Sequence, residues 1–588
     1  MKYKRFFTNS FFCYLFALGL ILPHSVQAQE PVVSFSCPGG FYDNSFILSL
    51  SCPDSLSIHY TLNGNIPTVA DMVYQRPLTL DDELFSKSNI HTIQTCHDSI
   101  WHPANSVQKC IIVRASAFDL NGDQVGETIT NSYFIKSLGC NSHGLPIVSI
   151  CVDSLSLFDQ EYGIMATNES DDTITENYMQ RGRQWERLCN LEFYELNNDG
   201  INQNAGLRIH GESSRWSSQK GLRLYARKEY GQKRFRHEFF GPDELDSFKH
   251  LVLKPLKNGL LGEHICTPIA KSLNVDAPAV RPTILFLNGE YWGIYYLEER
   301  ADAQFLADHY GYRKNDINVI ESWKGKTVDG NNDSFLQMIQ WFDQADLSDE
   351  EAYRQACSLI DIDCFIDYYC LELYAGNDDW PMSNMKCWQA ENGKWRWIFT
   401  DGDGCLCGYR NMWSGIINNT NKSTLIFDRL LENQDFRDQF YSRFGRLIIN
   451  EFEYKTTKKF LENSYVMVTD EVDRHIARFG MPDSREEFEF HKHEYINTFL
   501  YYRPLYVSRL LYYLFYINDW EYRKAAKASQ YQFKYNPNKR KPVYLLHMAR
   551  QLREWKYVKL YNRYVKLYHK YKRSQIKAKW KSRLQKVF

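Results

Sequence analysis

The chain has 588 residues, with 71 acidic and 70 Lys or Arg side chains, and 44% of its residues are hydrophobic. A chain of this length normally folds into several domains of roughly 100–200 residues each. The hydrophobic and aromatic content supports large packed cores, which excludes a wholly disordered protein. The near-zero net charge conceals an asymmetry, because residues 521–588 carry 21 Lys and Arg against two acids. The rest of the chain is therefore net acidic, which points to an electrostatic partner for the tail, either another molecule or the acidic body itself.

The first 28 residues have the pattern of a secretory signal. Lys2, Lys4 and Arg5 precede an apolar run from Phe11 to Leu22, and small residues at 26–28 supply a cleavage site. The run is shorter than the ~20 residues that cross a bilayer, so we expect no transmembrane anchor after cleavage. The sequence predicts an exported protein, which is periplasmic, at the cell surface or secreted.

Residues 31–137 contain short alternating runs that are broken by Gly, Pro, Asn and Asp. This spacing predicts a small antiparallel β-sandwich. In an exported protein, Cys37 with Cys52 and Cys96 with Cys110 are plausible disulfide pairs. The segment SIHYTLNGNIPT, with Tyr74 following, resembles the chitobiase carboxy-terminal-like or fibronectin-associated module. That resemblance implies a spacer or interaction role.

A mixed region follows from residue 145. GLRIHG, KGLRLYAR, RPTILFLNGEYWGIYYLEE and KWRWIFT read as strands, and helical periodicity covers residues 302–309, 348–360 and 424–450. The chain reads mostly as helix from about residue 456, and residues 516–588 form a basic helical tail. The predicted fold class is multidomain α+β, with an N-terminal β-sandwich, an α+β domain and a helical C-terminal extension.

The segment from Asp379 to Asp403 combines carboxylates and an amide at a spacing that suits phosphoryl transfer. Asn384 follows Asp379 by five positions, and Asp401 and Asp403 follow a predicted hairpin around residues 391–393. In phosphoryl transfer one carboxylate accepts the proton of the incoming hydroxyl, while an amide and a second carboxylate hold magnesium. The protein-kinase catalytic loop has the same Asp-x-x-x-x-Asn spacing before a metal-binding Asp. A phosphotransferase is therefore the leading interpretation.

The segment GLRIHGESSRWSSQKGLRLYAR offers a strand, a polar turn and a second strand. Gly211 permits close approach of the backbone to a ligand, and Ser213 and Ser214 can donate to phosphate oxygens. Lys220 opens the second strand and can reach a phosphate as a point charge. A serine-rich hairpin turn is often only a turn, so the segment alone leaves both interpretations open.

Four motifs in a fixed order resemble the CotH (spore coat protein H) kinase family. RIHGESS with QKGLRL resembles its Arg-Gly-Asn-Ser-Ser signature, and LNGEYWGIYYLEERADAQFL resembles its Asn-Gly-Glu-Tyr pattern. The Asp379–Asn384 loop and TDGDG resemble its catalytic and metal motifs. LIFDRLLENQDFRDQFYSRFGRLI and FLYYRPLYV resemble its helical carboxy-terminal portion. The resemblance implies an atypical kinase-like domain over residues 145–515.

The resemblance also implies an activity, in which the protein uses ATP and Mg or Mn to phosphorylate protein Ser or Thr. It implies that Asp379 is the catalytic base, that Asn384 and Asp401 are metal ligands, and that Asp403 is a possible further ligand. The residues implied at the nucleotide are Gly211, Ser213, Ser214 and Lys220 at the phosphates, with Glu299 near the nucleotide or orienting Lys220.

The sequence departs from the family pattern at three positions. His210 and Glu212 stand where the family has Arg and Asn, and Gly402 stands where it has an apolar residue. A carboxylate in a phosphate-binding turn repels the ligand unless it holds a cation.

Two alternatives to an active kinase remain open. One is a catalytically silent kinase-like scaffold, and the other is a cell-surface adhesion or glycan-associated protein. The expected partners are a nucleotide and a protein substrate, and the positive tail favours an acidic protein. Basic residues interleaved with aromatics also suit nucleic acid, but export of the chain makes us expect no nucleic-acid partner.

Overall fold

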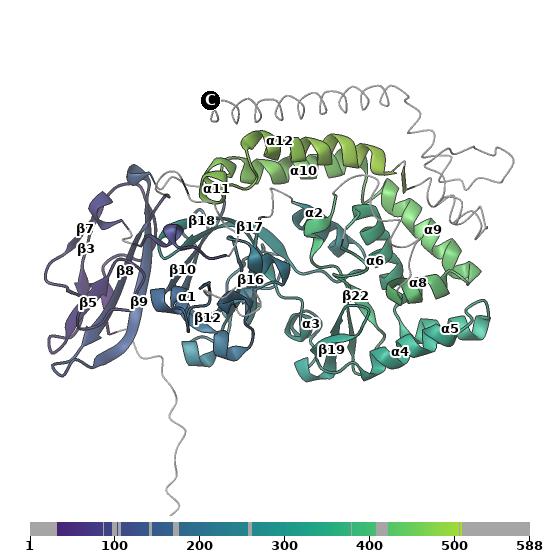
Figure 1. Ribbon diagram of the computed structural model, residues 1–588, viewed down its shortest axis with the longest axis horizontal. Coiled ribbons are helices and arrows are strands. Elements are labelled where there is room, and N and C mark those ends of the chain that lie inside the picture. The colour runs from purple at the N-terminus through teal and green to yellow at the C-terminus, as the bar shows by residue number, and fades with distance from the viewer. Residues whose placement is uncertain are drawn as a thin grey trace, which may run out of the picture.

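The computed structural model describes residues 32–507, except 86–87, 97–102, 104–106, 140–143, 168–175, 257–260, 378, 407–421 and 505. The predicted signal and the basic tail lie outside the described residues. Figure 1 shows the N-terminal strands at one end, a barrel beside them, and a mixed region with most of the helices beyond. Within the described part of the chain, no helix is both long and apolar enough to cross a membrane.

The N-terminal strands form one five-stranded sheet and two small strand pairs. The sheet order is β2 (Gly40–Tyr42), β9 (Gln124–Ile135), β8 (Ile111–Phe118), β5 (Ser57–Thr61) and β6 (Met72–Val73). The small pairs are β3 (Phe46–Leu48) with β7 (Leu78–Leu80), and β1 (Ser34–Phe35) with β4 (Leu50–Ser51). Most of these pairs are antiparallel, as predicted, but β2 runs parallel to β9.

The two faces of strand β8 belong to different cores. Ile111 and Val113 pack among the N-terminal strands, whereas Ile112 belongs to the core of the main domain. The ring of Phe134 on β9 contacts the ring of Phe286 edge-on, with 5.0 Å between centroids. The N-terminal sheet is thus buried against the barrel through one of its faces.

The cysteines of the N-terminal region do not form the disulfides considered from the sequence. The structure has no disulfide between Cys37 and Cys52 or between Cys96 and Cys110. Cys96 and Cys110 are buried, and they contribute as small apolar side chains.

Seven strands form a closed barrel. Their order is β10 (Ile147–Val152), β11 (Arg187–Tyr194), β12 (Gly200–His210), β13 (Gly221–Tyr225), β16 (His250–Pro255), β18 (Glu290–Glu299) and β17 (Val280–Leu287). β10 closes the barrel by pairing in parallel with β17. Successive side chains of a strand point to opposite faces, so β12 sends Leu207 and Ile209 into the apolar core and leaves Arg208 and His210 on the outer face.

A second sheet lies in the part of the chain that follows the barrel. Its order is β20 (Lys326–Asp329), β19 (Ile317–Glu321), β21 (Lys386–Ala390) and β22 (Arg396–Ile398). The hairpin predicted around residues 391–393 is confirmed, because β21 and β22 pair antiparallel with Lys386 opposite Ile398. Asn392 takes a positive φ of 59° in the turn, which Asn tolerates better than most residues.

Helices surround this second sheet. They are α3 (Ala303–Tyr310), α4 (Asp333–Gln344), α5 (Glu350–Leu359), α6 (Ile362–Ala375), α8 (Leu425–Leu430) and α9 (Gln434–Ile449). The predicted helical stretch 424–450 is two helices, because Asn433 starts α9 by accepting a hydrogen bond from the Phe436 amide at 3.1 Å. Helices α10 (Tyr454–Thr469), α11 (Val472–Phe479) and α12 (Arg485–His493) then run back towards the barrel (Figure 1). The described chain is therefore a mixed α/β protein.

Candidate active site

The loop that carries Asp379 follows helix α6. Asp361 starts this helix by accepting a hydrogen bond from the Cys364 amide, and Gly376 ends it in the left-handed conformation. From Cys364 to its last residue every side chain of α6 is buried, so the helix is fixed in the core. The chain then turns and leaves Asp379 exposed to solvent. An exposed carboxylate at the end of a fixed helix is accessible to the hydroxyl of an incoming acceptor.

The hairpin β21–β22 returns the chain to this loop and places Asp401 beside it. The backbone oxygen of Asp401 accepts hydrogen bonds from the side-chain amides of Asn377 at 3.5 Å and Asn384 at 3.3 Å. These two asparagines lie on either side of Asp379 in the sequence. The carboxylate of Asp401 is 45% exposed, and Asp403 is half-buried in the same turn. The structure thus joins the two loops that the sequence singled out.

Lys254 lies at the centre of the site, although sequence reasoning did not find it. Its Nζ lies 3.0 Å from a carboxylate oxygen of Glu263, 3.2 Å from Glu298 and 3.3 Å from Asp401. Lys254 comes from barrel strand β16 and Glu263 from helix α2 (Gly262–Ser272). A strand lysine paired with a helix glutamate is the arrangement that positions the phosphates in protein kinases.

Glu263 also connects the helix to the metal-loop candidate. Its carboxylate accepts a hydrogen bond from the backbone N–H of Asp401 at 2.9 Å. Gly262, at the start of the same helix, lies so close to the loop that an added Cβ would be 2.6 Å from the carbonyl oxygen of Gly402. One end of α2 therefore touches both the lysine and the loop of Asp401.

The charges around Lys254 shift each other's protonation. Burial alone would lower the pKa of Lys254, but the carboxylates of Glu263, Glu298 and Asp401 raise it well above its ordinary value. Burial, together with the neighbouring carboxylates of Glu263 and Asp401, raises the pKa of Glu298 well above its ordinary value. The amine of Lys254 therefore stays charged.

Lys220 makes different contacts from those the resemblance implied. Its Nζ donates to the backbone oxygens of Arg215 at 2.6 Å and Ser217 at 3.2 Å, and it lies 3.7 Å from the centre of the Tyr178 ring. Burial lowers the pKa of Lys220 to about 7. Lys220, which was expected to face the phosphates, thus holds the turn 211–220 together from inside, and the lysine that contacts Asp401 is Lys254.

Glu299 does not orient Lys220 in the structure. One of its carboxylate oxygens accepts from the Ala279 amide at 2.9 Å, and the other lies 2.9 Å from Nε2 of His309. Its neighbour Glu298 contacts Lys254 instead. Adjacent strand residues point to opposite faces, so only one glutamate of the pair can face the lysine.

The turn after Gly211, which was predicted to bind phosphates, is partly exposed and is held by the buried side chain of Arg215. Gly211 has a φ of +97°, and an added Cβ would lie 1.9 Å from the hydroxyl of Ser214, so this position requires glycine. Ser213 is exposed and Ser214 is half-buried. Arg215 anchors the turn by donating to the carbonyl oxygen of Gly211 at 2.7 Å and of Ile209 at 2.8 Å.

Positive side chains gather near the end of strand β12. Burial, followed by the positive charges of four neighbouring side chains, holds the pKa of His210 well below its ordinary value. Those neighbours are Arg223, Lys254, Arg300 and Lys386. His210 is therefore neutral, and its Nδ1 lies 2.6 Å from a guanidinium nitrogen of Arg223. This cluster of positively charged side chains suits a polyanion such as the phosphate chain of a nucleotide.

The residues of the site fit a nucleotide with a divalent metal ion. The carboxylate of Asp401 and the side-chain amide of Asn384 supply oxygen donors, which Mg²⁺ prefers. Among the described residues there is no group of three or more His, Cys, Asp or Glu arranged to hold a metal. Mg²⁺ at phosphate sites commonly uses one or two protein carboxylates together with substrate phosphates, so such a group is not required.

The signal for Lys254 and Glu263 in the sequence is weak. Lys254 ends the apolar run HLVLKP, and Glu263 opens a helix that begins a few residues later. A lysine that ends a buried strand, followed by a glutamate in the next helix, is the local pattern that points to the pair. Lys220 directly precedes strand β13 and so has a similar local pattern.

Comparisons with known proteins give one family match and loose similarities to solved structures. No curated protein matches the chain. Among solved structures, HipA in the Shewanella oneidensis MR-1 toxin–antitoxin complex with HipB and operator DNA is 12% identical, with a TM-score of 0.21, over 46% of this chain and 66% of that chain. The Helicobacter pylori proinflammatory kinase CtkA is 11% identical, with a TM-score of 0.17, over 50% of this chain and 92% of that chain. Both superpositions are too loose to carry an argument about activity.

The match at the level of sequence families is extensive. Residues 207–507, just over half of the chain, match the family described as CotH kinase protein. This range contains the turn at Gly211, the Lys254–Glu263 pair and the loops of Asp379 and Asp401. The chain therefore belongs to the CotH kinase protein family.

Proposed function

We propose that the protein is an exported atypical kinase that transfers the γ-phosphoryl group of ATP to a Ser or Thr hydroxyl of a protein. The observation that carries the proposal is the contact of Lys254 with Glu263 and Asp401, because it joins a phosphate-binding lysine to a metal-loop carboxylate. Family membership supports the kinase-like class. The donor nucleotide, the acceptor and the export are part of the proposal.

In this proposal each side chain has one task. Lys254 holds phosphate oxygens of the donor, and Glu263 holds Lys254 in place. Asp401 and Asn384 hold Mg²⁺ or Mn²⁺, which neutralises phosphate charge when bound. The acceptor oxygen forms a bond to the γ-phosphorus as the bond from that phosphorus to the bridging oxygen breaks, so ADP leaves with the electron pair. Asp379 takes the hydroxyl proton, and its exposure leaves room for the acceptor.

Phosphate transfer by the purified full-length protein tests this proposal. The protein is incubated with γ-labelled ATP, Mn²⁺ or Mg²⁺, and dephosphorylated casein as an acidic acceptor. We expect label in casein or in the protein itself, with losses in Asp379→Ala, Asp401→Ala and Lys254→Met. Arg354→Gln is a matched control, because Arg354 is an exposed residue of α5 whose ion pair in the described part of the chain is with nearby Glu351.

The other outcomes identify the alternatives. Metal-dependent ATP binding without any label in wild type contradicts an active kinase and favours a silent scaffold. Neither binding nor label, together with retention on polysaccharide, favours an adhesion or glycan-associated protein. Because ATP is scarce outside the cytoplasm, the assay is repeated with other nucleoside triphosphates and pyrophosphate as donors.

A further inference from the structure

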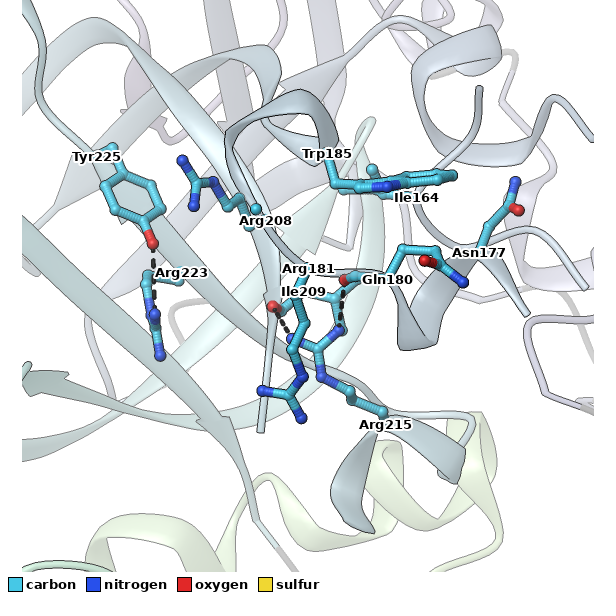
Figure 2. A pocket seen from close by; sticks show the side chains of 11 residues that line it. Ile164, Asn177, Gln180, Arg181, Trp185, Arg208, Ile209, Arg215, Arg223 and Tyr225 are labelled. Atoms are coloured by element: carbon cyan, nitrogen blue, oxygen red, sulfur yellow. Dashed lines mark hydrogen bonds between the residues drawn. The ribbon is translucent and has the colours of Figure 1, made fainter. Parts of the chain in front are cut away.

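A cavity lies beside strands β12 and β13, next to the turn 211–220. Its volume is about 180 Å³, and strands β12 and β13 form one wall through Arg208, Arg223 and Tyr225. The segment that precedes β11 forms the opposite wall with Arg181 and Trp185. Figure 2 shows Arg181 and Arg215 together at one end, Arg208 and Arg223 nearer Tyr225, and the Trp185 ring over Ile164. We call this cavity the arginine pocket.

The arginine pocket carries an excess of positive charge. Four arginines line it, whereas none of the described residues in its lining is an Asp or Glu. Arg208 pairs with the buried Glu186 at 2.5 Å, but Glu186 also pairs with Arg227. The exposed Glu212 lies 4.0 Å from Arg181, at the rim. Glu186 and Glu212 are therefore shared among Arg181, Arg208 and Arg227.

Two arginines of the pocket have neutral hydrogen-bond partners, although the charges of Glu212 and Asp302 act on them from further away. Arg215 donates to backbone oxygens alone, including that of Tyr178 at 2.6 Å. Arg223 donates to the hydroxyl of Tyr225 at 3.3 Å and contacts the neutral His210. Burial and then the charges of Arg181 and Arg223 lower the pKa of Arg215 to about 10, so these guanidinium groups repel one another. A bound anion would relieve this repulsion.

The pocket also contains hydrogen-bond donors that lack acceptors. The Nε–H groups of Arg208 and Arg223 are both buried, and neither has a hydrogen-bond partner in the described part of the chain. A buried donor without an acceptor is unfavourable by about 1–3 kcal/mol. Guanidinium groups present several N–H donors in a plane, which matches the oxygens of phosphate.

We propose that the arginine pocket binds a phosphoryl group at a position separate from the Lys254–Asp401 site. The pocket connects to that site through Arg223 and His210, whose neighbours include Lys254. The group can come from two sources. One is an already phosphorylated residue of a protein acceptor, and the other is a phosphate of the nucleotide donor.

Binding of inorganic phosphate, measured by calorimetry at low ionic strength, tests the proposal without requiring transfer activity. We expect wild type and Lys254→Met to bind phosphate equally, and Arg208→Gln and Arg223→Gln to bind it at least about tenfold more weakly. Arg181→Gln should also weaken binding, and because its side chain is 56% exposed the variant should fold normally. Arg354→Gln is the control for loss of a surface arginine. Thermal unfolding verifies that each variant is folded.

Three results would contradict phosphate binding in the arginine pocket, and two others identify the source of the phosphate. Absence of saturable phosphate binding in wild type, or binding that Arg181→Gln and Arg223→Gln leave unchanged, overturns it. Loss of binding only in Lys254→Met also overturns it, because phosphate would then occupy the nucleotide site. When binding follows the arginines, displacement by a phosphoserine peptide but not by ADP with Mn²⁺ identifies an acceptor as the source. Displacement by ADP with Mn²⁺ identifies the donor.

Discussion

Replacing Lys254 or Lys220 with methionine, one at a time, tests which of the two lysines binds phosphate. The sequence favoured Lys220 as the phosphate-binding lysine, whereas the structure places Lys254 against Asp401. We predict that Lys254→Met lowers kcat by about 10²–10³, the usual effect of removing one charged or oriented donor at a reacting oxyanion. Lys220→Met should lower it less than about tenfold, because no phosphate contact is lost.

The effects on stability follow from the contacts of each lysine. Loss of the Lys254 amine leaves the buried Glu263 and Glu298 without their cation, which costs about 3–5 kcal/mol for a buried pair. The raised pKa of Glu298 reduces this figure, since its carboxyl can take up a proton instead. Lys220→Met removes two hydrogen bonds of about 1 kcal/mol each, but it also removes a charge that burial disfavours.

The assay compares both variants at equal folded fraction. Urea unfolding gives that fraction, initial rates with γ-labelled ATP give kcat, and thermal shifts with ATP and Mn²⁺ report nucleotide binding. Retention of wild-type transfer by folded Lys254→Met would refute the assignment. A loss of ATP binding in Lys220→Met greater than that in Lys254→Met would restore the interpretation drawn from the sequence.

Three further changes test other parts of the structure. Burial raises the pKa of Glu192 to about 7 from 4.5 despite its hydrogen bonds, so between these values the folded protein keeps a proton that the unfolded chain has lost. The free energy of unfolding should fall across that window by up to about 3 kcal/mol, and Glu192→Gln should abolish this fall in urea melts at pH 5, 6, 7 and 8. Gly262→Ala should press a Cβ against Gly402 and raise the Mn²⁺ concentration for half-maximal transfer by about tenfold, measured by metal titration. Arg503→Met should destabilise by about 3 kcal/mol in urea unfolding, because the buried guanidinium donates to the Tyr374 carbonyl oxygen at the end of α6.

Each of these predictions has a result that contradicts it. Parallel pH profiles for wild type and Glu192→Gln would mean that the carboxyl is ionised in the folded protein. An unchanged metal requirement in Gly262→Ala would mean that α2 and the loop of Gly402 can move apart for the added Cβ without weakening metal binding. An unchanged urea midpoint in Arg503→Met would mean that water replaces its hydrogen bonds. Arg354→Gln serves as the control in all three series.

Local signals in the sequence predicted those elements that are determined locally. The hairpin of β21 and β22 follows from two strand-like runs around a Glu-Asn-Gly turn, and its position fixes where Asp401 returns to the Asp379 loop. The barrel strands β12 and β13 were also visible as a strand–turn–strand pattern. Each of these depends on neighbours within about thirty residues.

The central lysine could not be predicted in the same way. Lys254 meets Asp401 across 147 positions of sequence, and only closure of the barrel and docking of α2 bring the two together. The role of Lys220 depended equally on tertiary structure, because nothing local indicates that its amine turns inward to Arg215. The helical stretch predicted over 424–450 contains a break at the polar residues that follow α8, where Asn433 caps α9.

The double contact of Glu263 makes the site sensitive to the position of a single helix. The same carboxylate holds the Lys254 amine, which belongs to the barrel, and the Asp401 backbone N–H, which belongs to the loop after β22. A small outward shift of α2 would break both contacts at once. Helix α10 packs against α2, so this packing also keeps the Lys254 amine and the Asp401 loop together.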